Sequence, residues 1–196
     1  MNRISSASLD HAFHALAAFL EDAGAKPERF VLIGGSALIA LGLISRTTRD
    51  ADIMAGVDAA RGLVDPRPLS QALQAAAYKV ARELNLDENW LNTGPADQLR
   101  AGLPDGFRDR LTARHYGPCL TVYLPDRFDL LHFKLHAAVD QGAGRHTSDL
   151  LALHPTGTEL LAAAHWVLTQ DAGEVFPAIV RSTLNQLGHE SVARQI

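Results

Sequence analysis

The chain has 196 residues, of which 47% are hydrophobic and 20% are charged, and its formal net charge is −4. This composition is typical of one globular domain, or of one small domain with a helical extension, and the negative charge excludes an overall attraction to nucleic acid. The one cysteine, Cys119, excludes an internal disulfide, and the absence of a long apolar run or an N-terminal hydrophobic segment indicates a cytoplasmic protein with no membrane partner.

Apolar periodicity and turn-forming residues predict the secondary structure. In chain order we expect a helix over 8–23, a strand over 30–33, a short buried helix over 37–43, a strand over 50–54, a helix over 68–84, an irregular loop over 86–105, a hairpin of strands over 107–115 and 120–124, and helices over 126–139, 148–153, from a capping box at 156–159 to 170, and over 174–187. This order favours an α/β (α+β) fold, a small mixed sheet flanked by helices with a helical C-terminal part. We expect a core over 1–140 and a C-terminal extension over 141–196 that packs on it.

The strongest functional pattern lies in the first two predicted strands and between them. Gly34 and Gly35 end the first strand, and Ser36 follows at the expected N-cap of a helix. Such a turn leaves unpaired backbone amides without side chains over them, which suits a phosphate. Asp50 and Asp52 are two residues apart, so a strand would place both carboxylates on one face. Adjacent carboxylates favour a cation such as Mg²⁺ that also binds substrate phosphates, and the pattern therefore indicates phosphoryl transfer.

The glycines and aspartates belong to a longer pattern, formed by Gly34, Gly35, Ser36, Gly42, Arg46, Thr48, Asp50 and Asp52. It resembles the signature of the DNA polymerase β-type nucleotidyltransferase superfamily. Its R-x-T-x-D-x-D part is similar to the corresponding motif of the toxin-like nucleotidyltransferases of type IV abortive-infection systems and their tRNA-modifying relatives. The resemblance implies metal-dependent transfer of a nucleoside monophosphate from a nucleoside triphosphate to a hydroxyl of tRNA or of a protein. It also implies a toxin-antitoxin system with a cognate antitoxin.

Two later segments match this family in the expected order: Lys134 lies in Phe133-Lys134-Leu135-His136-Ala137-Ala138, and Asp149 opens Asp149-Leu150-Leu151-Ala152-Leu153 after a basic loop. By resemblance, the catalytic residues are Asp50, Asp52, Lys134 and Asp149, with Asp50 and Asp52 on Mg²⁺ or Mn²⁺. The implied nucleotide-binding residues are Gly34, Gly35, Ser36, Arg46, Thr48 and Lys134. Asp149 would orient the triphosphate or supplement the carboxylates. From the residues alone, the alternative for Lys134 is a lysine at the edge of the core, and the alternative for Asp149 is an acid at a helix N-terminus.

Many members of the superfamily carry a third metal-binding carboxylate on a later strand, and the predicted strand over 120–124 contains none. Asp109 and Asp126 are the alternatives. The lack of a third carboxylate would weaken activation of an acceptor hydroxyl more than nucleotide binding. The alternative function is therefore a catalytically degenerate protein of this fold that binds nucleotide or a partner protein.

Two further features each leave two interpretations open. One is a basic cluster, which is either a local RNA-binding patch or a solvated hairpin with acidic residues interspersed. Its members are Arg100, Arg108, Arg110, Arg114 and His115. The other is Trp90, which is either a stacking partner for a base or a core residue.

Overall fold

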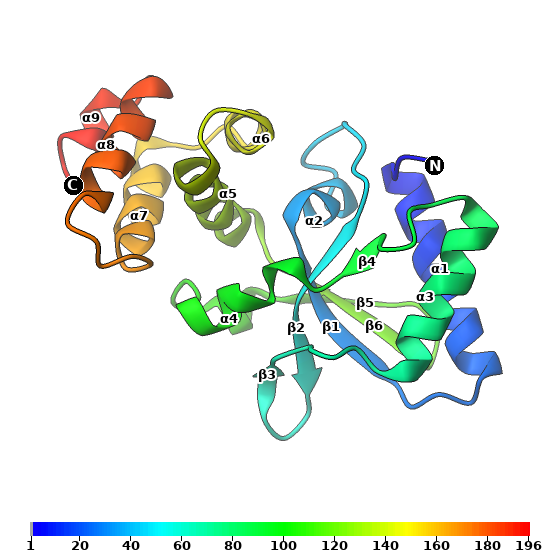
Figure 1. Ribbon diagram of the computed structural model, residues 1–196. Coiled ribbons are helices and arrows are strands. Elements are labelled where there is room, and N and C mark those ends of the chain that lie inside the picture. The colour runs from blue at the N-terminus through cyan, green and yellow to red at the C-terminus, as the bar shows by residue number, and fades with distance from the viewer. Residues whose placement is uncertain (1) are drawn as a thin grey trace. The chain divides into compact units, whose positions relative to one another are not determined.

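The computed structural model describes residues 2–196 (Figure 1). Its internal contacts divide the chain into two compact units. The first contains residues up to 103 together with 107–126, and the second contains 104–106 together with 127–196.

This division follows residue 126, whereas the sequence placed a boundary at residue 140. The difference comes from helix α5 (Arg127–Gln141), which packs with the later helices of the second unit. The α5 helix is therefore part of the helical C-terminal region.

A mixed sheet of six strands forms the centre of the first unit within the described residues. Its strands are β1 (Glu28–Ile33), β2 (Ala51–Asp58), β3 (Gly62–Val64), β4 (Leu91–Asn92), β5 (Thr112–His115) and β6 (Leu120–Leu124). The order is β3-β2-β1-β6-β5, and β4 also pairs with β2. Strand β1 runs antiparallel to β2 and parallel to β6, and β5 and β6 form the expected hairpin. The predicted α/β class with a mixed sheet is thereby confirmed.

The helices of the first unit are α1 (Ser6–Asp22), α2 (Gly34–Ala40), α3 (Gln71–Leu84) and α4 (Gln98–Ala101). Helices α1 and α3 pack against each other, and α1 buries the predicted apolar face and ends before Gly24, whose φ is +59° (Figure 1). Trp90 is fully buried, and its Nε1 donates to the carbonyl of Ala77 at 2.9 Å. Trp90 is therefore a core residue rather than a stacking platform. Helix α3 begins at Gln71 rather than at Pro68, because Ser70 is its N-cap and the Ser70 hydroxyl accepts from the Leu73 amide.

The second unit is helical, with α5, α6 (Arg145–Ala152), α7 (Gly157–Leu168), α8 (Phe176–Gln186) and α9 (Glu190–Ala193). The capping box before α7 is confirmed, because the Thr156 hydroxyl accepts from the Glu159 amide at 3.2 Å and the Glu159 carboxylate accepts from the Thr156 amide at 2.8 Å. Arg127 pairs with Glu159 and donates to the carbonyl of Leu153, so it ties the start of α5 to the connection between α6 and α7. In the part of the chain that the structure describes, no helix combines the length and hydropathy needed to cross a membrane.

Candidate active site

The glycine turn and the two aspartates meet at one end of the sheet. Because β2 runs opposite to β1, the last residue of β1, Ile33, pairs with Asp52 near the start of β2. Asp50 directly precedes the strand. Ala51 and Ile53 are completely buried, whereas Asp50 and Asp52 are half-buried, which is the alternation predicted for this stretch. Both carboxylates therefore belong to the end of the sheet at which the glycine turn lies.

Gly34 lies directly against the Asp52 carboxylate. Its φ is +73°, in the left-handed region that favours glycine, and a β-carbon at this position would collide with Oδ2 of Asp52. A β-carbon at Gly35 would lie 2.9 Å from a guanidinium nitrogen of Arg46 and 3.4 Å from Oγ1 of Thr48. The structure thus brings the predicted glycines together with Arg46, Thr48 and Asp52.

Ser36 is not the N-cap that the sequence predicted. Helix α2 begins at Gly34 and ends at Ala40, because the left-handed Gly34 turns the chain straight out of β1. Ser36 lies inside the first turn of α2, with no exposed surface, and its hydroxyl donates to the carbonyl of Ile33 at 2.9 Å. The same hydroxyl accepts from the Asp52 amide at 3.3 Å. Ser36 therefore connects the glycine turn to the aspartate strand.

Thr48 holds the carboxylate of Asp50. Its hydroxyl donates to Oδ1 of Asp50 at 3.0 Å, and its backbone pairs with Ile4 in an isolated bridge. Arg46, two residues earlier, donates to the carbonyl of Thr47 at 3.0 Å while its guanidinium lies beside Gly35. The polar connection between α2 and β2 is therefore ordered by the residues of the R-x-T-x-D pattern themselves.

The sequence did not predict the role of Asn92. Strand β4 pairs with β2 so that Asn92 lies opposite Asp52, and Nδ2 of Asn92 donates to Oδ1 of Asp52 at 3.2 Å. The strand has only two residues and lies inside the expected loop over 86–105. The polar Asn92 after the apolar pair Trp90 and Leu91 was the available signal, and it is too short for a strand assignment.

The residues present fit a hard divalent cation held by two carboxylates. Carboxylate oxygens are the ligands that Mg²⁺ and Mn²⁺ prefer, and Mg²⁺ completes its coordination with water and substrate phosphates. Among residues 2–196, no three His, Cys, Asp or Glu side chains form a group that could hold a metal. Asp109 lies in a 3₁₀ helix over Phe107–Arg110 rather than on a strand, and Asp126 pairs with Arg110 at 3.9 Å. Among the described residues, neither Asp109 nor Asp126 forms such a group with Asp50 and Asp52.

Lys134 and Asp149 form an ion pair within the second unit. Nζ of Lys134 lies 2.7 Å from Oδ2 of Asp149, and the two side chains are 4% and 2% exposed. Lys134 is therefore not a lysine that reaches out of the core edge. Helix α6 begins at Arg145, three residues earlier than predicted, so Asp149 lies in the middle of the helix and not at its N-terminus. The structure pairs the two residues that the resemblance singled out, although they are fifteen positions apart.

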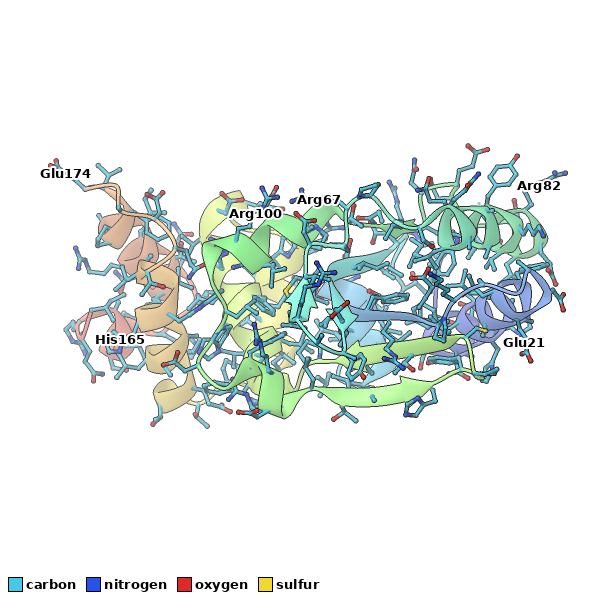
Figure 2. All side chains as sticks on the ribbon, turned by 90° about the horizontal axis from the view of Figure 1, so that it is seen from below. Glu21, Arg67, Arg82, Arg100, His165 and Glu174 are labelled. Carbon is cyan, nitrogen blue, oxygen red and sulfur yellow. The ribbon has the colours of Figure 1, made fainter. Side chains whose placement is uncertain are left out.

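The basic cluster of the sequence is largely engaged by protein groups. Arg67 and Arg100 lie close together because Asp65 pairs with both (Figure 2). Hydrogen bonding by Arg67 lowers the pKa of both Asp65 and Asp97. Elsewhere Arg114 donates to the carbonyl of Ala40 at 2.8 Å. Asp65 therefore offsets the charge of Arg100, whereas the carbonyl of Ala40 holds Arg114 without neutralising it.

Comparison with protein-family models, with curated proteins and with solved structures finds no match to this chain. A function therefore has to come from the residues themselves and from their geometry. One end of the sheet carries the turn of Gly34 and Gly35, the guanidinium of Arg46 and the carboxylates of Asp50 and Asp52. Each carboxylate accepts a hydrogen bond on its Oδ1.

Proposed function

We propose that this protein is a metal-dependent nucleotidyltransferase, which moves a nucleoside monophosphate from a nucleoside triphosphate to an acceptor hydroxyl. The observation that carries the proposal is the approach of the Gly34 turn to the carboxylate of Asp52, beside Asp50. A turn without side chains lets phosphate oxygens reach backbone amides and carboxylate-bound cations at the same place. This combination suits a triphosphate better than an uncharged ligand.

In this proposal the chain's own residues bind and orient the triphosphate. The amides of Gly34 and Gly35 hold its phosphate oxygens, and the guanidinium of Arg46 beside Gly35 offsets their charge. Asp50 and Asp52 would hold Mg²⁺ or Mn²⁺, which when bound stabilises negative charge on the phosphates and on the leaving group. Thr48 keeps the Asp50 carboxylate in place through its hydroxyl.

The transfer step needs a group that accepts the proton of the acceptor hydroxyl. We assign this role to Asp52, whose carboxylate lies against the Gly34 turn. The hydroxyl oxygen forms a bond to the α-phosphorus, the bond from this phosphorus to the bridging oxygen breaks, and pyrophosphate leaves. The proton passes to the Asp52 carboxylate.

The resemblance extends the proposal to the acceptor. The acceptor is a hydroxyl of tRNA or of a protein, in a toxin-antitoxin system with a cognate antitoxin. Lys134 and Asp149, for which the resemblance implies roles toward the triphosphate, pair with each other at 2.7 Å within the second unit.

The rival function is a degenerate protein of this fold that binds nucleotide or a partner protein without turnover. The specific observation in its favour is that, within residues 2–196, no group of three or more His, Cys, Asp or Glu side chains could hold a metal ion. Binding of a triphosphate needs only the turn and the cation.

The two functions are separated by incubating the protein with each of the four α-labelled nucleoside triphosphates, Mg²⁺ and total bacterial RNA, then resolving labelled RNA from labelled protein. We expect label with the wild type and a loss of about 100-fold or more in Asp50→Ala and Asp52→Ala. The matched control is Asp58→Ala, because Asp58 lies at the opposite end of β2 and bonds to the amides of Ala60 and Arg61. Absence of label from the wild type with every nucleotide would favour the degenerate binder, whose melting temperature a triphosphate should still raise.

A further inference from the structure

We infer that Asn92 is a positioning residue that fixes the orientation of the Asp52 carboxylate at the candidate metal site. Nδ2 of Asn92 donates to Oδ1 of Asp52 at 3.2 Å, while Oδ2 of Asp52 faces Gly34. Each oxygen of the carboxylate thus has its own neighbour, which defines the rotation of the group about its last torsion. The significance of this for catalysis rests on the proposed nucleotidyltransferase function.

The orientation of the Asn92 amide is itself determined. Its Oδ1 accepts from the backbone amide of Gly94 at 2.8 Å, and an N–H group can only donate to an oxygen. The other end of the amide, the NH₂ group, is therefore the one that faces Asp52. A reversed amide would place a nitrogen against the Gly94 amide and an oxygen against a carboxylate.

The strand that carries Asn92 is held by the core. The amide of Ala51 donates to the carbonyl of Trp90, and β4 continues parallel to β2 with Asn92 opposite Asp52. Trp90 is completely buried and bonded through Nε1 to Ala77 in α3. Two residues would be too short a strand to order itself, so the buried indole beside it positions Asn92.

Asn92 also occupies the strand position next to Asp52 on the edge of β2 that faces away from β1. A carboxylate there would add a third negative charge, whereas an amide adds a donor and no charge. The proposed site therefore has two charged ligands, Asp50 and Asp52, and the neutral Asn92 at the neighbouring strand position orients Asp52. Partners that orient a metal ligand in this way typically contribute about 10- to 100-fold to metal affinity or activity.

The first test needs no metal. In ¹⁵N-labelled protein, the Asn92 side-chain amide is assigned as the signal that Asn92→Ala removes. We expect one of its protons to lie downfield in the wild type and in Asp50→Ala, and to move upfield in Asp52→Ala. An Asn92 signal that Asp52→Ala leaves in place would overturn the inference.

The second test measures Mn²⁺ binding, with the free ion quantified by electron paramagnetic resonance. Asn92→Ala should weaken binding by about 10-fold or more. If Asn92 acts only through the carboxylate, the double variant Asn92→Ala/Asp52→Ala should bind Mn²⁺ no more weakly than Asp52→Ala alone. The positioning role would be contradicted if Asn92→Ala bound Mn²⁺ as tightly as the wild type. It would also be contradicted if the double variant bound Mn²⁺ more weakly than Asp52→Ala by the same factor that separates Asn92→Ala from the wild type.

Asp50→Ala distinguishes a failed inference from a failed function. If Asp50→Ala loses Mn²⁺ affinity and Asn92→Ala does not, the metal site stands and the role of Asn92 is wrong. If Asp50→Ala binds Mn²⁺ as the wild type does, the proposed metal site is wrong, and the amide signal alone decides whether Asn92 holds Asp52.

Discussion

Ser36 and Asp52 are joined by a hydrogen bond from the Asp52 amide to the Ser36 hydroxyl, 3.3 Å long, although they are sixteen positions apart. The same hydroxyl donates a hydrogen bond to the carbonyl of Ile33 at 2.9 Å. One buried oxygen thus connects the end of β1, the start of α2 and the strand that carries the aspartates. The spacing between turn and carboxylate is set inside the protein before any ligand binds.

Replacing this hydroxyl should therefore destabilise the fold. Ser36→Ala removes both hydrogen bonds and leaves the carbonyl of the buried Ile33 and the amide of the half-buried Asp52 without these partners, so we expect a loss of about 1–3 kcal/mol in the free energy of unfolding by urea. The control is Ser148→Ala, an exposed serine in α6, which should change it by less than about 0.5 kcal/mol. Equal midpoints for Ser36→Ala and the wild type would show that the hydroxyl does not hold the strand.

Gly34→Ala should be more damaging than alanine at other left-handed glycines. Gly24 has a similar φ of +59° but no atoms within 4 Å of an added β-carbon, so Gly24→Ala measures the backbone cost alone, about 1–2 kcal/mol. At Gly34 the collision with Oδ2 of Asp52 adds to this cost. In an Asp52→Ala background the extra loss should shrink. The measurement is urea unfolding of the wild type, Gly24→Ala, Gly34→Ala, Asp52→Ala and Gly34→Ala/Asp52→Ala. Equal losses at Gly34 and Gly24 would contradict the close approach.

The turn and the aspartate strand were predictable from the sequence because their signals are local: a glycine pair after an apolar run, and carboxylates in alternation with buried residues. The start of α2 was misplaced because the sequence does not state which glycine takes a positive φ, and Gly34 rather than Ser36 starts the helix. The strand expected from residue 107 instead begins at Thr112, after a 3₁₀ turn that local alternation does not distinguish.

Tertiary pairing explains the features that were missed. Asn92 meets Asp52 only because β4 adds to the edge of β2, and a two-residue strand has no periodicity of its own. The contact between Lys134 and Asp149 likewise depends on tertiary packing, because the two residues lie on different helices. Their family resemblance named both residues, but nothing local indicated that they form one buried pair.

Replacing either member of the Lys134–Asp149 pair should destabilise the protein. Lys134 and Asp149 are almost fully buried, and removing one partner leaves a buried charge, so Lys134→Met and Asp149→Leu should each lose about 3–5 kcal/mol in urea unfolding. The double variant, which leaves neither charge, should lose far less than the sum. Arg194→Met, at an exposed cation of the same unit, should lie within about 0.5 kcal/mol of the wild type. Additive losses in the double variant would contradict direct pairing.

Acid should weaken the second unit through Glu159. The Arg127 side chain and the Thr156 amide lower the pKa of Glu159 from 4.5 to about 2, so the folded state favours the carboxylate. The stabilisation is complete above about pH 4.5 and is lost as the pH falls from there towards 2. Glu159→Gln should therefore lose about 1–3 kcal/mol at pH 7 and less at pH 3. Glu190→Gln in α9 serves as the control, and a pH-independent difference for Glu159→Gln would contradict the charged interaction.

Asn92→Asp should make the stability of the protein unusually dependent on a divalent cation. The substitution keeps an oxygen for the Gly94 amide but places a second carboxylate at the position 3.2 Å from Oδ1 of Asp52. Without metal, the like charges repel, and the melting temperature should fall below that of the wild type. With Mn²⁺ between three carboxylates, the melting temperature should rise more than in the wild type or in Asn92→Ala, because a ligand that binds only the folded state stabilises it in proportion to its affinity. The measurement is thermal unfolding of the three proteins with and without Mn²⁺. An equal Mn²⁺-induced rise in all three would mean that the cation does not bind beside Asp52.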